Sequence, residues 1–146
     1  MPGTVVRVLP RTFFDHSAQA TGSVEKVVAK GVEIGSYVRR SFVVRLHGLS
    51  VTSGATGWKV EVIVRPDAPT DQDPGVEWQC KGSPTDLGSL TIDTTATNLN
   101  EVGDFGRVDL TDSAGGWVKV VVKVTQGGTP AAKLSFDISA DLVLTS

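Results

Sequence analysis

The sequence predicts an all-β protein, an antiparallel two-sheet sandwich that is jelly-roll-like and has about eight strands. Apolar and polar residues alternate along most of the chain, as they do in strands that bury one face. Turn-forming residues separate these stretches at intervals of about ten to twenty residues. No series of helical stretches lies between them to connect parallel strands. The 146 residues suit one domain with one core.

The N-terminal segment, residues 1–23, has two interpretations. Residues 4–9 and 12–14 have the composition of strands, and the stretch that follows them is polar. The segment is either the first strand of the sandwich or an arm that adds to a neighbouring subunit's sheet through main-chain hydrogen bonds. The sandwich proper is placed at residues 24–146, and within it residues 24–30 are the one stretch that could be helical.

Two strands with clear alternation follow, at residues 38–46 and 58–64. Each places valine, leucine or aromatic residues on one face and mainly charged or polar residues on the other, with Arg40 as the misfit in the first strand and Ile63 on the second face of the second. Residues 71–75 are rich in turn formers, and residues 76–80 alternate again. We therefore expect a long-looped hairpin whose second strand points Trp78 into the core.

The C-terminal half supplies the remaining strands. A weaker strand is expected within residues 87–94, and the polar residues 95–104 are expected to cross from one sheet to the other, leading to an edge strand at 105–110. Residues 118–124 and 134–144 alternate most regularly, and the length of the last strand suits a central position. One shared core is expected to contain residues from three of these strands: Val60, Val62, Val120, Val122, Phe136 and Ile138. An immunoglobulin-like sandwich is the alternative, but the paired cysteines of the antibody-type core are missing.

The charge balance argues against a nucleic-acid-binding protein. The net charge is -2, from 14 Lys and Arg against 16 Asp and Glu, whereas a nucleic-acid binder needs a basic stripe. Residues 1–47 nevertheless hold seven Lys or Arg and three Asp or Glu, a net +4, which leaves -6 for the remainder. The two parts either neutralise one another within the sandwich, or the first is a basic docking segment.

The sequence predicts a cytoplasmic site of synthesis and no disulfide. Cys80 is the single cysteine, so it has no internal partner. No apolar stretch approaches the roughly 20 residues that span a bilayer, and the first residues lack a signal-peptide pattern. We therefore expect no membrane association.

The residues available for catalysis or metal binding are few. His16 and His47 are the two histidines, and Asp15-His16 lacks a recognisable nucleophile motif to complete a triad. We therefore expect no enzymatic activity and no cofactor. The oxygen ligands of Asp71, Asp73 and Glu77 form the best candidate for a calcium site, although their spacing is not that of an EF-hand.

Aromatic and basic residues supply the candidate interface. Trp58 and Trp78 are in phase with apolar strand faces, which predicts that they belong to the core. Tyr37 and Trp117 are out of phase, so they are expected to be exposed or to lie at an interface. The predicted interface residues are these two and the basic residues of the N-terminal strand: Arg7, Arg11, Tyr37 and Trp117.

Several stretches together resemble the small β-sandwich virion proteins of tailed bacteriophages. Residues 53–64 join a Ser-Gly-Ala-Thr-Gly turn to a Trp-Lys-Val-Glu-Val-Ile-Val strand, and Gly75-Val76-Glu77-Trp78 follows as a Gly-x-x-Trp element. Residues 116–130 then supply a Val-rich strand and a Gly-Gly-Thr-Pro turn, and residues 134–136 begin the final strand. The order of these elements matches that of the phage proteins over residues 38–144, apart from a longer acidic loop at 67–74.

The resemblance implies a structural virion component, most plausibly a decoration or cement protein on the outside of the capsid. Its implied partners are the major capsid protein and copies of itself as a homo-oligomer, with no nucleic acid or membrane. It implies no catalytic residues. The alternative is a tail or baseplate accessory module that binds host carbohydrate through exposed aromatic rings.

Overall fold

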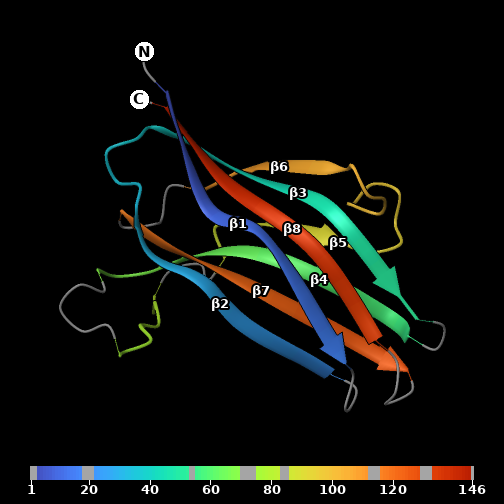
Figure 1. Ribbon diagram of the computed structural model, residues 1–146. Helices are drawn as coiled ribbons and strands as arrows, with labels where there is room; N and C mark the ends of the chain where they lie inside the picture. The colour runs from blue at the N-terminus through green and yellow to red at the C-terminus, as the bar shows by residue number, and fades with distance from the viewer. Residues whose placement is uncertain are drawn as a thin grey trace.

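The computed structural model describes residues 3–17, 22–52, 55–69, 75–82, 86–111, 116–128 and 133–145. Within these ranges the chain forms eight β-strands (Figure 1). They are β1 (Gly3–Ser17), β2 (Gly22–Glu33), β3 (Arg39–Val51), β4 (Ala55–Pro66), β5 (Gly88–Ile92), β6 (Phe105–Asp109), β7 (Trp117–Gly128) and β8 (Lys133–Thr145).

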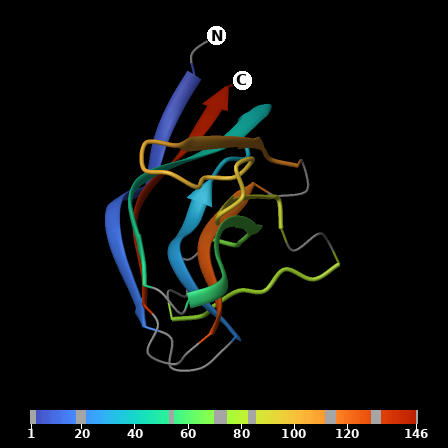
Figure 2. The ribbon, with the colours of Figure 1, turned by 90° about the vertical axis from the view of Figure 1, so that its right-hand side faces the viewer.

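The strands form two four-stranded sheets that pack face to face (Figure 2). Sheet A has the order β1-β8-β3-β6 and sheet B the order β2-β7-β4-β5, and the paired strands are antiparallel. This order results when long antiparallel hairpins wrap into two Greek keys, which is the jelly roll. The predicted two-sheet sandwich is therefore confirmed.

The ends of the chain lie side by side in sheet A. Strand β8 has β1 on one side and β3 on the other, so the last strand is central as expected. Strand β1 pairs with β8 from Gly3 to Ser17, with register shifts between Arg7 and Thr12. Val8 and Leu9 of β1 are buried in the core. Residues 3–17 therefore lie in the sandwich as its first strand.

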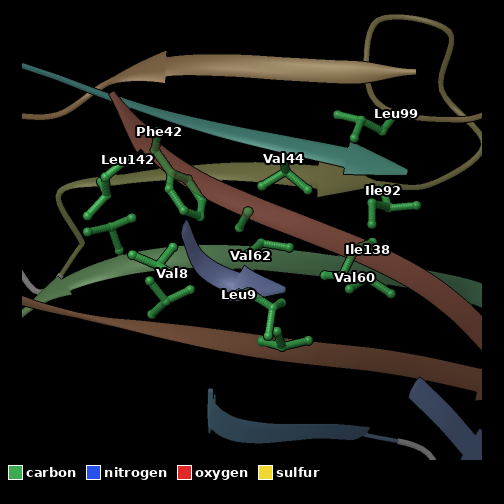
Figure 3. Close-up of a cluster of buried hydrophobic side chains, with 14 of the residues drawn as sticks. Val8, Leu9, Phe42, Val44, Val60, Val62, Ile92, Leu99, Ile138 and Leu142 are labelled. Atoms are coloured by element: carbon green, nitrogen blue, oxygen red, sulfur yellow. The ribbon is translucent and has the colours of Figure 1, made fainter. Parts of the chain in front are cut away.

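The core fills the space between the inner faces of the two sheets (Figure 3). It contains all six residues predicted to share it, and Phe42, Leu142 and Leu144 join them. Trp58 is half-buried and packs against this core, as its phase predicts. The segment between β5 and β6 crosses from sheet B to sheet A, and β6 lies at an edge, both as expected.

Strand β2 corrects one expectation from the sequence. Residues 24–30, the stretch that could be helical, lie within β2 and pair with β7. The mixed charges of Glu25, Lys26 and Lys30 are compatible with a helix, but β7 offers a long valine-rich partner strand. Pairing with it overrides the local preference, because strand formation depends mainly on tertiary neighbours.

The predicted hairpin strand at residues 76–80 is also wrong. The described residues 75–82 contain no strand, and Trp78 is 40% exposed instead of buried in the core. Strand β4 already has β7 and β5 as neighbours, so no free edge remains for a further strand beside it. The segment instead lies outside sheet B (Figure 2), where the Lys119 amine donates to the Trp78 carbonyl oxygen at 2.8 Å.

Candidate functional site

The outer face of sheet A is covered by ion pairs that cross from strand to strand. Asp141 of β8 is 2% exposed and stands between Arg7 of β1 and Arg45 of β3. Arg7 Nε donates to one oxygen of this carboxylate and Arg45 Nη1 donates to the other. Each arginine is about half exposed, so the pair of guanidinium groups covers the carboxylate from solvent. The arrangement ties both neighbouring strands to β8.

A serine–histidine contact lies on the same face. His47 Nε2 is 2.8 Å from the Ser139 hydroxyl oxygen, which is hydrogen-bonding distance. Ser139 is 1% exposed, so a substrate carbonyl cannot reach this hydroxyl. The two carboxylates of β8 on either side of Ser139, Asp137 and Asp141, are already bound by arginines. The contact therefore serves to hold β3 against β8, and these residues do not have the geometry of a catalytic triad.

A basic depression of about 480 Å³ lies where β3 begins and β6 ends. Its lining includes three arginines, Arg39, Arg40 and Arg107. Arg107 Nη2 donates to the Ser41 hydroxyl, which in turn donates to Asp109 at 2.7 Å. Asp109 is the single carboxylate in the lining, so the positive charges outnumber it. An anionic group is the chemistry that this surface suits.

The outer face of sheet B carries a second network around Arg65 of β4. Its Nη1 and Nη2 atoms each donate to one oxygen of Glu25 in β2 at 3.0 Å, and its Nε donates to Asp86 at 2.9 Å. The hydrogen bonds from Arg65 lower the pKa of the Glu25 carboxyl below its usual value of 4.5. The same partners raise the pKa of Arg65. This network joins β2 and β4 across β7.

The Glu25 pKa predicts a small loss of stability in acid. Because the carboxyl has a lower pKa folded than unfolded, its contribution is fully present above pH 4.5 and is lost as the pH falls through the folded value. The Glu25 side chain is 44% exposed, so solvent screens the pair and we expect about 0.5 kcal/mol at most. Urea unfolding at a series of pH values should show that Glu25→Gln lowers stability at pH 7 and has no effect at pH 2. An equal effect at both pH values would contradict the assignment.

The four predicted interface residues do not form one cluster. Arg7 and Arg11 lie on the outer face of sheet A, where Arg11 Nε donates to Asp137 at 2.8 Å. Tyr37 lies in the connection between β2 and β3 and packs partly against the core. Trp117 begins β7 in sheet B and is half-buried. Their role in an interface stays a prediction.

The candidate calcium loop is described in part. Asp71 and Asp73 lie outside the described residues, and Glu77 lies 3.6 Å from the amines of both Lys30 and Lys119. Cys80, half-buried, forms no disulfide. Across the ranges that the structure describes, no three His, Cys, Asp or Glu side chains gather closely enough to hold a metal ion. The same ranges contain no helix long and apolar enough to cross a bilayer.

Sequence reasoning missed both the basic depression and the carboxylate at Asp141. The residues of the depression come from β3, β6 and β8, and they are brought together by strand order. The one available signal was the excess of positive charge over residues 1–47, which contains Arg39 and Arg40. Nothing in the sequence near Arg107 indicates that this residue lies beside Arg39 and Arg40 in the depression.

Comparisons with known proteins do not identify a family for this chain. No family model matches the sequence, and no curated protein matches it. Among solved structures, a chain from the structure of infectious bursal disease virus Gx strain is similar, at 12% sequence identity and a TM-score of 0.45. The match covers 97% of this chain and 31% of the viral one, so this chain spans about a third of that chain's length. The strand order, and not this likeness, carries the fold assignment.

Proposed function

We propose that this chain is a non-enzymatic structural protein of a virus particle. In this proposal it is a decoration or cement protein of a tailed bacteriophage that binds the outer capsid surface and stabilises the shell. Its partners are the major capsid protein and further copies of itself. It is made in the cytoplasm of the bacterial host and then joins the virion.

The jelly-roll strand order is the observation that carries this proposal. Eight-stranded jelly rolls recur in viral capsid proteins, and also in lectins and cupins, so the strand order alone does not distinguish among these classes of protein. The sequence resemblance to phage virion proteins favours a structural role in a virus particle over the other classes. The surface supports it too, because Asp141 and Glu25 are engaged by arginines that join neighbouring strands. Carboxylates held in this way stiffen a surface and are poorly suited to proton transfer.

The basic depression is the part of the surface best suited to a capsid lattice with acidic side chains. Arg39 and Arg107 are exposed on the outer face of sheet A, and Val38 beside them is 74% exposed. An apolar side chain next to arginines is typical of the composition of protein interfaces. Opposite charges on the shell would speed association and orient the bound subunit.

Rebinding to particles that lack the protein tests the proposal. We expect wild type to bind such heads in numbers set by their symmetry, and to bind less as salt is raised. The double variant Arg39→Glu/Arg107→Glu should bind at least about tenfold more weakly, since it reverses the charge of the contact. Lys59→Glu, on the exposed side of sheet B, is the matched control and should bind as wild type does. Absence of wild-type binding to heads would overturn the proposed function, and unchanged binding of the double variant would overturn the surface.

The exposed Trp78 favours one alternative, a tail or baseplate module that binds host carbohydrate. This ring is 40% exposed, whereas Tyr37 and Trp117 are half-buried. Exposed aromatic rings stack on sugars. Labelled protein found on tails rather than heads, together with loss of binding to host-cell polysaccharide in Trp78→Ala, would support this function over capsid decoration.

A further inference from the structure

Strand β6 is an edge of sheet A whose outer main-chain groups have no partner (Figure 1). It pairs with β3 alone, and this pairing has no register shift. Asp104 and Leu110, on either side of β6, form main-chain hydrogen bonds with β3 at 2.9 Å. Because hydrogen-bonded residues alternate along an antiparallel strand, the even-numbered residues between them also bond β3, and the odd-numbered residues direct their N–H and C=O groups away from it. Within the described ranges these outward groups have no hydrogen-bond partner, and they belong to Phe105, Arg107 and Asp109.

The space beside this edge is open. A depression of about 380 Å³ is lined by Phe105, Gly106 and Arg107 of β6 and by residues 96–100 of the connection from β5. The Phe105 side chain is 71% exposed, so it is available for contact with another chain. An added strand can therefore approach β6 along its length.

The other edges of the two sheets are less suited to the addition of a strand. The pairing of β1 is irregular between Arg7 and Thr12, and Pro10 within this part has no N–H to donate. The pairing of β2 is irregular between Val27 and Val32. Such irregularities and proline protect edge strands from pairing with other chains. Strand β5 pairs regularly but has no charged residue that would select a partner.

The charges near β6 favour an acidic partner. Four arginines of the chain each hold a carboxylate. The other three are Arg39, Arg40 and Arg107, and in the described part of the chain no carboxylate lies within ion-pair distance of them. All three line the basic depression, and Arg107 also lines the depression beside β6. Arg107 Nη2 donates to the Ser41 hydroxyl at 3.0 Å, which leaves further N–H donors of this guanidinium for a carboxylate.

The same charge argues against a second copy of the chain at this edge. Two β6 strands related by a two-fold axis would pair their odd-numbered residues with one another. The register that pairs all three sets Phe105 opposite Asp109 and Arg107 opposite Arg107 of the partner copy. Like charges directly opposite one another destabilise a strand pair, whereas opposite charges stabilise it. A segment with a carboxylate opposite Arg107 is therefore the better partner.

We propose that β6 binds an extended acidic segment of a partner protein, which pairs with it antiparallel as a fifth strand of sheet A. The main chain of the segment bonds the free groups of Phe105, Arg107 and Asp109, and a glutamate or aspartate at its centre lies opposite Arg107. Main-chain bonds supply affinity in this mode of recognition, and the side chain supplies specificity. This inference rests on the proposed function, since the partner is then the shell protein, and it specifies the conformation and charge of the shell segment.

A capped peptide, Thr-Thr-Glu-Thr-Val, tests the edge in the purified chain by NMR. We expect saturable shifts in β6, with slower amide exchange at Phe105, Arg107 and Asp109. Exchange at Gly106 and Val108, which already bond β3, should change little. The matched control, Thr-Thr-Lys-Thr-Val, places a lysine opposite Arg107 and should bind about tenfold more weakly. Absence of saturable shifts up to about 5 mM, or equal binding of the two peptides, overturns the proposal.

Two substitutions of Phe105 test the same edge on particles that lack the protein. Phe105→Pro removes a free N–H and places a ring in the path of an added strand, whereas Phe105→Ala removes the side chain and keeps the N–H. Both should melt at similar temperatures, because proline is tolerated where the N–H of an edge strand faces solvent. We expect Phe105→Pro to bind heads at least about tenfold more weakly than Phe105→Ala.

The outcomes separate this inference from the proposed function. Equal binding of the two folded variants to heads that wild type binds would overturn the added strand and leave capsid decoration standing. Wild type that fails to bind heads would overturn capsid decoration, and the peptide titration then decides whether β6 accepts an acidic strand.

Discussion

Phe136→Ala is expected to remove a large share of the stability of this domain. Phe136 of β8 is 1% exposed, and its ring stacks on that of Phe14 in β1, with centroids 5.0 Å apart and planes 14° from parallel. Truncation of a buried phenylalanine costs about 3–5 kcal/mol, from lost transfer free energy and from the cavity left behind. Domains of this size have about 5–15 kcal/mol in total. Urea unfolding should show the loss as a lower midpoint with an unchanged slope.

The control for this substitution is another phenylalanine. Phe105 is 71% exposed in β6, so Phe105→Ala removes the same atoms without opening a cavity. Its expected cost is within about 0.5 kcal/mol, as for most surface substitutions. A Phe136→Ala variant as stable as Phe105→Ala would mean that the inner and outer faces of β8 are exchanged.

The strands could be predicted from the sequence where alternation and burial agree. Strand β8 is the clearest example: Leu134, Phe136 and Ile138 point inward while Lys133 and Ser135 point outward, as the period of two requires. Alternation failed at residues 76–80, because a strand also needs a neighbour with free hydrogen-bonding groups. The alternation also gave no sign that Ile63 of β4 and Val121 of β7 are buried, because both residues lie out of phase with the core-facing residues of their strands.

The candidate sites could not be predicted, because their residues are distant in sequence. Asp141 is separated by 134 residues from Arg7 and by 96 from Arg45. Their contact depends on the register of β1 and β3 against β8, including the shifts at the bulges. A displacement by one residue would send these side chains to the opposite face of the sheet. Composition alone indicates an excess of arginine in the N-terminal third. The fold determines which carboxylates these arginines contact.

Asp141→Asn is expected to have the second largest effect. The substitution keeps the size of the side chain and removes the charge that two guanidinium groups share, in a position where the carboxylate is 3% exposed. Loss of a partner for a buried charge costs up to 3–5 kcal/mol, but Arg7 and Arg45 are about half exposed and can turn to water. We therefore expect about 1–3 kcal/mol, from the loss of charged hydrogen bonds.

The same change should loosen β1 more than the rest of the domain. Asp141 joins β1 to β8 through Arg7, and β1 has no strand on its other side in sheet A. Amide hydrogen exchange in β1 should therefore become faster in Asp141→Asn, while the amides of β4 and β7 should follow global stability alone. Glu61→Gln is the matched control, since Glu61 pairs with an exposed lysine, Lys59, at 3.4 Å. Its cost should stay below about 0.5 kcal/mol. Equal costs for the two substitutions, with unchanged exchange in β1, would show that the Asp141 carboxylate does not hold the first strand in place.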